Sequence, residues 1–119
     1  MKVLITCFIR YTIDKSSLAD FEHYARVWMR LIEKYGGTHL GYFVPGDDLP
    51  EATFSFPGIG EPGPGNVAIA LFSFGSREAY DFYRSEVAKD PECAVVTRHF
   101  EQTKCFSKYE RTFLQPVLR

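Results

Sequence analysis

The chain has 119 residues, which fits a single domain of ordinary size. Its 14 basic and 15 acidic residues give a net charge of −1, and the basic residues form no run, which argues against a nucleic-acid partner. No stretch approaches the roughly 20 apolar residues of a membrane span, so we expect no membrane partner. Aromatic residues make up 16% of the chain, which predicts a pocket or an interface lined by rings.

The cysteines Cys7, Cys93 and Cys105 show no paired spacing. An odd, unclustered set is typical of reduced thiols in a cytoplasmic protein rather than of a disulfide framework. A zinc site would need four ligands, usually in two close pairs, so we expect no metal. The glycine-rich stretches do not join a strand to a helix and therefore do not qualify as phosphate loops. We expect a cytoplasmic protein without a cofactor.

The first predicted elements are a strand and an amphipathic helix. Residues 2–12 are rich in β-branched and aromatic side chains, and both faces are largely apolar, which is typical of a strand covered on both sides. Ser17 then begins a helix, with Asp20 three residues later in a capping-box-like arrangement. Gly36-Gly37 ends this helix, because glycine accepts the left-handed turn at a helix C-terminus. Apolar residues recur at helical spacing between these ends; they are Leu18, Phe21, Ala25, Trp28, Leu31, Ile32 and Tyr35.

A second strand is predicted over residues 38–44, ended by Pro45-Gly46. The loop 45–65 that follows is rich in Gly and Pro, with residues 53–56 as the only strand-like interruption. A loop of this length is either a lid over a binding site or a hairpin extension that packs its phenylalanines on a partner chain. The sequence leaves both interpretations open.

The second half repeats the strand and helix pattern. Residues 66–74 predict a third strand, apolar on both faces, and Ser76 caps a helix over residues 77–88. Asp90 as cap and Pro91 at the first position begin a shorter helix. Residues 104–114 alternate as a final strand.

This order predicts an α+β, ferredoxin-like βαββαβ fold, with a four-stranded antiparallel sheet and the helices on one face. The first and third strands are also apolar on the opposite face, which the chain has nothing left to cover. An exposed patch of that size indicates an interface. We therefore expect the protein to pair with itself, as a homodimer or a higher oligomer, through the open face of the sheet.

A ligand pocket is expected between the helices and the sheet, near the end of the second strand. The candidate pocket residues are Trp28, His39, Tyr42, Tyr83 and Arg98, and His39 and Tyr42 are the candidates for catalysis, since imidazole transfers protons near neutral pH. Strand alternation places His39 on the same face as Gly41 and Phe43. Arg111, on the buried side of the last strand, would need a carboxylate partner, so we favour a structural ion pair over substrate binding for it.

Three stretches carry a resemblance to a known family: Glu33-Lys34-Tyr35-Gly36-Gly37, Asp90-Pro91-Glu92, and the closing Tyr109-Glu110-Arg111-Thr112-Phe113-Leu114 with Pro116. The sequence resembles the NIPSNAP family, within the dimeric α/β-barrel superfamily. The resemblance implies a single NIPSNAP-like domain over residues 1–119, whose sheet packs on the sheet of a partner. It implies no activity, because the family has no common reaction. The Gly- and Pro-rich insert is longer than the usual hairpin of the family.

Three functions are consistent with these observations. The one we favour is a protein that binds a small hydrophobic or aromatic molecule without catalysis. The first alternative is a cofactor-independent monooxygenase or isomerase of the dimeric α/β-barrel type. The second is a structural assembly subunit without a ligand.

Overall fold

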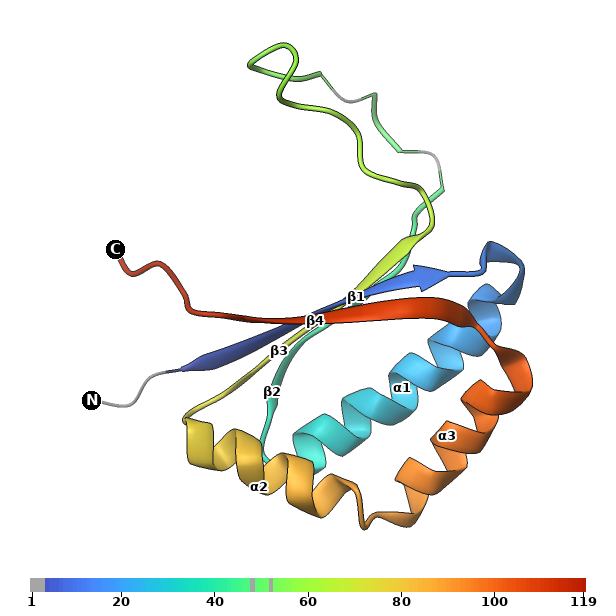
Figure 1. Cartoon of the computed structure of the whole chain (residues 1–119), viewed down its shortest axis with the longest axis vertical. Coiled ribbons are helices and arrows are strands. Elements are labelled where there is room, and N and C mark those ends of the chain that lie inside the picture. Colours follow the sequence, from blue (N-terminus) through green and yellow to red (C-terminus); the bar gives the residue numbers. More distant parts are fainter. Residues whose placement is uncertain (1–3, 48, 52) are drawn as a thin grey trace.

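The computed structural model describes residues 4–47, 49–51 and 53–119. An antiparallel sheet of four strands, in the order β2-β3-β1-β4, carries the helices on one face (Figure 1). The elements are β1 (Ile5–Ile13), the 3₁₀ turn η1 (Lys15–Ser17), α1 (Leu18–Lys34), β2 (Thr38–Phe43), β3 (Val67–Phe74), α2 (Arg77–Val87), α3 (Pro91–Thr103) and β4 (Phe106–Leu114). The ferredoxin-like α+β fold is confirmed, including the division of its second helical segment.

The core lies between the helices and the sheet. Alternate residues of the two central strands point into it, because successive side chains of a strand point to opposite faces. Pairing of β1 with β3 places Cys7 opposite Phe72 and Ile9 opposite Ala70, and all four side chains are buried. The stripe predicted for α1 packs onto this face; its buried members include Phe21, Ala25, Leu31 and Ile32.

The other face of the sheet is apolar at its centre, and no element of the described chain covers it. Phe8 lies opposite Leu71 on this face, and both are half-buried. Phe43 pairs with Ile69 at the β2 edge, and its side chain is 54% exposed. We call this surface the open face.

The described residues between β2 and β3, which are 44–47, 49–51 and 53–66, form an arm that rises on the side of the sheet away from the helices (Figure 1). Residues 53–56, predicted as strand-like, form no strand; the chain turns there, with Phe56 at φ +60° and its carbonyl accepting a hydrogen bond from Ile59 N at 3.0 Å. Phe56 and Ile59 are 73% and 81% exposed. The arm therefore places large apolar side chains away from the core of its own chain.

The helix caps are those the sequence predicts, with one exception. Ser76 Oγ accepts a hydrogen bond from Ala79 N at 3.1 Å and caps α2. Ser17 makes no side-chain cap bond at the start of α1. Asp14 instead caps the preceding 3₁₀ turn, where its carboxylate accepts from Ser16 N at 3.0 Å. This short turn brings the chain from β1 into the helix and makes the predicted capping box unnecessary.

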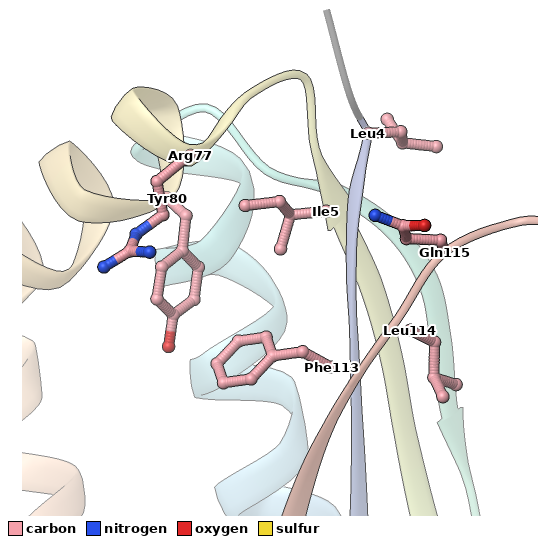
Figure 2. Close-up of a pocket in the computed structure, with 7 residues that line it drawn as sticks. All are labelled: Leu4, Ile5, Arg77, Tyr80, Phe113, Leu114 and Gln115. Atoms are coloured by element: carbon pink, nitrogen blue, oxygen red, sulfur yellow. The ribbon is translucent and has the colours of Figure 1, made fainter.

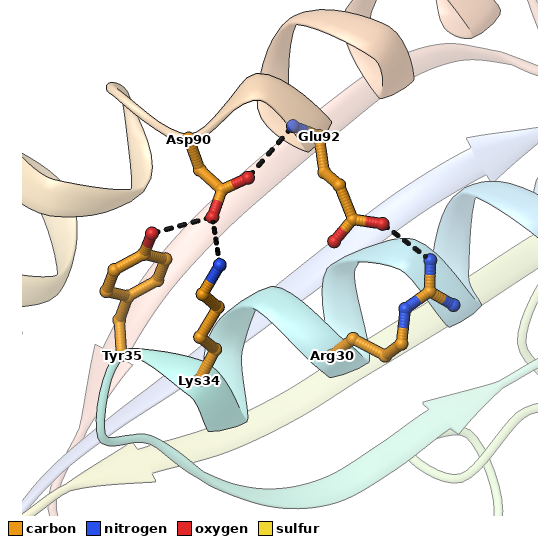
Figure 3. Close-up of polar contacts among 5 residues, drawn as sticks. All are labelled: Arg30, Lys34, Tyr35, Asp90 and Glu92. Atoms are coloured by element: carbon orange, nitrogen blue, oxygen red, sulfur yellow. Dashed lines mark hydrogen bonds and ion pairs between the residues drawn. The ribbon is translucent and has the colours of Figure 1, made fainter.

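Asp90 joins the ends of the helices (Figure 3). Its carboxylate accepts hydrogen bonds from Lys34 Nζ at 2.8 Å, from the Tyr35 hydroxyl at 2.6 Å and from Glu92 N at 2.9 Å. The side chain is only 2% exposed. One buried carboxylate thus caps α3 and binds the C-terminal end of α1. An ion pair between Arg30 and Glu92, 3.0 Å apart, lies beside it.

Other possible features are not found in the described part of the chain. No helix there is long and apolar enough to cross a membrane, and no group of three or more metal-ligating side chains gathers. Cys7, Cys93 and Cys105 are unpaired. Burial raises the pKa of the Cys7 and Cys105 thiols.

The Asp90 contacts predict a stability effect. Asp90→Ala removes the α3 cap and the contacts with α1, so we expect the melting temperature to fall by at least about 5 °C in calorimetry. Asp81→Ala is the matched control, because Asp81 forms an exposed ion pair with Arg77 within one helix. Equal melting temperatures for the two variants would contradict the role of Asp90.

The same carboxylate predicts a pH dependence. Its hydrogen bonds with Lys34 and Tyr35 lower the pKa of Asp90 from 3.8 to about 2. A carboxyl group with a depressed pKa in the folded state contributes stability that is complete above its unfolded pKa. We expect this contribution to be lost as the pH falls from about 4 towards 2, and Asp90→Asn to flatten that part of the stability curve measured by denaturant unfolding.

Candidate functional site

A cavity of about 150 Å³ lies between the sheet and the helices. Its lining comes from β1, α1, α2 and β4 and consists of Ile9, Tyr11, Tyr24, Trp28, Tyr83, Arg84, Tyr109 and Arg111. A second cavity of about 430 Å³ shares Tyr24, Trp28 and Tyr109 with the first and extends to Phe100 of α3 and Phe106 of β4. Together they offer an aromatic space with two guanidinium groups at one end.

The strand register explains why β4 contributes to this site. Tyr109 pairs with Tyr11 and Arg111 pairs with Ile9, and the β1 partners point into the core. Both β4 side chains therefore lie on the helix side, and the Arg111 guanidinium lies over the Tyr109 ring, 5.7 Å from its centroid. Trp28 and Tyr109 enter the space from opposite layers of the fold.

The tyrosine hydroxyls of the site are neutral. Burial raises the pKa of Tyr11, Tyr24 and Tyr83, so these phenols keep their protons near neutral pH. The Tyr11 and Tyr42 hydroxyls lie 3.4 Å apart. Trp28 Nε1 is buried and has no hydrogen-bond partner among the described residues. The cavity therefore presents hydrogen-bond donors on an aromatic wall.

The structure brings only some of the predicted pocket residues together. Trp28 and Tyr83 line the smaller cavity. Tyr42 is behind it, and its hydroxyl lies against that of Tyr11. His39 lines none of the described cavities, and Arg98 is exposed on α3 and lines none either.

A β-bulge changes the position of His39. The pairing of β2 with β3 shifts between His39 and Gly41, and Gly41 has φ +139°, which favours glycine. His39 and Tyr42 consequently lie on the helix side with stacked rings 5.4 Å apart, whereas Phe43 pairs with Ile69 of the open face. The prediction that His39 shares a face with Phe43 is wrong, because an extra residue interrupts the alternation.

His39 is packed among aromatic rings. Its imidazole stacks on Phe72 at 5.8 Å between ring centroids, as well as on Tyr42. Both ring nitrogens are buried without a hydrogen-bond partner in the described structure. Burial lowers the pKa of His39 from 6.5, although Glu33 opposes the shift. The imidazole is therefore neutral at neutral pH, and the half-buried residue packs against the core.

Sequence reasoning missed several residues of the cavity, among them Tyr24, Arg84 and Tyr109. Arg111 was expected to form an ion pair, yet neither Arg84 nor Arg111 pairs with a carboxylate of the described residues. The alternation of side chains along the last strand could have predicted Tyr109, since Tyr109 lies on the same face as Arg111. No sequence pattern of that kind predicts a cavity position for Arg84, which follows Tyr83 on α2.

A third cavity, of about 840 Å³, lies where the ends of β1 and β4 meet the start of α2 (Figure 2). Ile5, Tyr80 and Phe113 face one another there, and the Tyr80 and Phe113 rings meet edge to face at 5.3 Å. Leu4 and Leu114 lie on the other side of the strands. The Arg77 guanidinium in its lining is already paired with Asp81, at 3.2 Å. This cavity is wide and mostly apolar, and the positive charge of Arg77 in its lining is neutralised by Asp81.

The sequence model of the NIPSNAP family matches residues 6–118. The chain belongs to the NIPSNAP family. No curated protein matches it. Two of the three stretches that resemble the family are in contact in the structure, because Lys34 and Tyr35 of the first stretch bind Asp90 of the second. The third stretch carries Tyr109 and Arg111 into the cavity.

Solved NIPSNAP structures share the fold. A NIPSNAP family protein of unknown function from Agrobacterium tumefaciens is 14% identical, with a TM-score of 0.70 over 98% of this chain and 90% of the other. A NIPSNAP-like domain protein from Burkholderia xenovorans is 17% identical, with a TM-score of 0.70 over 98% and 88%. A putative antibiotic biosynthesis monooxygenase from Nitrosomonas europaea is 6% identical, with a TM-score of 0.63 over 98% and 93%. At these identities the likeness shows the fold alone.

The burial of His39 predicts how stability responds to mild acid. Its folded pKa lies below the unfolded value of 6.5, so the unfolded chain takes up the proton more readily. We expect the free energy of unfolding to decrease as the pH falls below about 6.5, and His39→Phe to remove that decrease. His23→Phe, at an exposed histidine of α1, should retain it. A His39→Phe curve parallel to that of the wild type would contradict the assignment.

Proposed function

We propose that this NIPSNAP protein is a cytoplasmic homodimer that binds a small aromatic or hydrophobic molecule between its helices and its sheet, without catalysis. The observation that carries the proposal is the pair of adjoining cavities around Tyr24, Trp28 and Tyr109. Ligand sites are mostly apolar concave spaces of about 300–1,000 Å³ with a few convergent polar groups. The larger cavity, of about 430 Å³, has that size, and polar groups lie in both cavities: Thr97, Ser107 and Lys108 in the larger, Arg84 and Arg111 in the smaller.

The aromatic wall suits a flat ligand. Phe100 and Phe106 stack at 4.3 Å between centroids in the lining of the larger cavity, which also includes the rings of Tyr24, Trp28 and Tyr109. Aromatic rings prefer offset-stacked or edge-to-face partners at such distances. The described lining of the cavities holds neither an imidazole nor a carboxylate, which supports binding over general acid or base chemistry.

The alternative is a cofactor-independent monooxygenase. Its support is the fold shared with proteins described as putative antibiotic biosynthesis monooxygenases. Fold alone is a weak guide to reaction. Aerobic incubation of a bound aromatic probe, followed by mass spectrometry of the probe, distinguishes the two functions: an added oxygen atom favours the enzyme, and unchanged probe favours the binding protein.

A second copy of the chain is the proposed occupant of the open face. Phe8, Ile69 and Leu71 form an apolar centre, with Arg10 opposite Glu110 towards the β4 edge. An apolar centre with a polar border is typical of protein interfaces, and two sheets pack well face to face. The arm rises on this same side (Figure 1), so a copy seated on the open face lies within its reach.

The dimer is tested by a charge on the open face. Ile69→Asp places a carboxylate at its apolar centre, and we expect the variant to sediment as a monomer or to aggregate, whereas the wild type sediments as a dimer at micromolar concentration. Val95→Asp, at an exposed valine of α3, is the matched control and should remain dimeric. A wild-type protein that sediments as a monomer at micromolar concentration would contradict the proposed dimer.

The ligand site is tested with a small aromatic series: phenylacetate, 2-naphthylacetate and their two amides. Trp28 is the only tryptophan, so its indole N–H gives a single cross-peak in a nitrogen-15 NMR spectrum. We expect at least one probe to shift that peak, and Trp28→Leu to weaken its binding in calorimetry roughly tenfold. Phe82→Leu, at an exposed aromatic residue of α2, should bind as the wild type does. If no probe binds at millimolar concentration, the structural-subunit alternative is favoured.

A further inference from the structure

The smaller cavity has an unusual balance of hydrogen-bonding groups. Arg84 and Arg111 bring positive charge, and neither pairs with a carboxylate of the described residues. By contrast Arg30, Lys34 and Arg77 each lie within 3.2 Å of a carboxylate oxygen. Both arginines are exposed residues at the rim of the same cavity, and their donors are available to a ligand there.

The remaining lining does not neutralise this charge. Tyr11, Tyr24 and Tyr83 are neutral phenols that can donate, because burial raises the pKa of each. Trp28 Nε1 is a buried donor that has no acceptor among the described residues. A buried donor without a partner is costly, and a guanidinium binds most strongly to an ionised acceptor. The described lining of the cavity therefore offers hydrogen-bond donors and contains no anionic acceptor.

We propose that the ligand of this site is a small aromatic or apolar carboxylic acid. This inference rests on the proposed binding function and names its ligand class. The carboxylate lies between the Arg84 and Arg111 guanidinium groups, which match it in geometry. The apolar body lies along Trp28 and Tyr109 and extends into the larger cavity towards Phe100.

The test compares each acid with its neutral amide. The acid 2-naphthylacetate and the amide 2-naphthylacetamide have nearly the same shape and differ in charge. We expect the acid to bind at least about tenfold more tightly in calorimetry, because hydrogen bonds to charged groups are stronger than neutral ones. Raising the salt concentration should weaken binding of the acid and leave binding of the amide nearly unchanged.

Variants of the two cavity arginines test whether these residues bind the carboxylate of the acid. Arg84→Gln and Arg111→Gln should each weaken binding of the acid roughly tenfold and weaken binding of the amide much less. Arg98→Gln is the matched control, because this exposed α3 arginine lines none of the described cavities. Melting temperatures close to that of the wild type check that each variant is folded.

The outcomes separate the two proposals. If acid and amide bind equally and both shift the Trp28 indole peak, the cavity binds ligands but the preference for an acid is wrong. If the acid binds more tightly yet both cavity-arginine variants retain that preference, the anion site is elsewhere and the inference fails. If neither probe binds, the proposed function fails and the acid preference fails with it.

Discussion

The arrangement of the helices depends on one buried carboxylate. Asp90 accepts three hydrogen bonds, from the end of α1 at Lys34 and Tyr35 and from the first turn of α3. Among the described residues no buried carboxylate joins the strands of the sheet, which are held by their own hydrogen-bond ladders and by the core. Because α1 carries Trp28 and the segment before Asp90 carries Tyr83, the contact also determines how the cavity walls lie relative to each other. Stability and the proposed binding site are therefore linked through the same residue.

The two faces of the sheet have different chemistry, and the alternation of the strands separates them. On β4, Arg111 lies on the helix side and lines the cavity, while its neighbour Glu110 lies opposite Arg10 of β1 on the open face. On β3, Ala70 lies in the core and Ile69 on the open face. The proposed ligand site and the proposed dimer interface therefore use opposite faces of the same strands and do not compete for side chains.

The sequence predicts the elements well because each has a local cause. The α1 stripe, the Ser76 and Asp90 caps and the paired glycines after α1 act over a few residues, and the structure confirms them. The site depends on longer-range geometry. The bulge beside Gly41 moves His39 to the helix side of the sheet, and no local sequence pattern predicts this bulge. The unpaired state of Arg111 depends on which carboxylates the tertiary fold brings near, and a periodic pattern contains no such information.

The arm carries a consequence for how related chains diverge. Phe56 and Ile59 contribute almost nothing to the core of their own subunit, because both are largely exposed at the end of a long projection. Substitutions there leave the folding of the single chain intact, whereas substitutions in the sheet alter folding and association together. In the proposed dimer, the arm is therefore the part of the molecule in which the preference for a partner can evolve independently of the fold. In a cell that contains several related chains, differences in the arm sequence would favour association between identical copies over association between different chains.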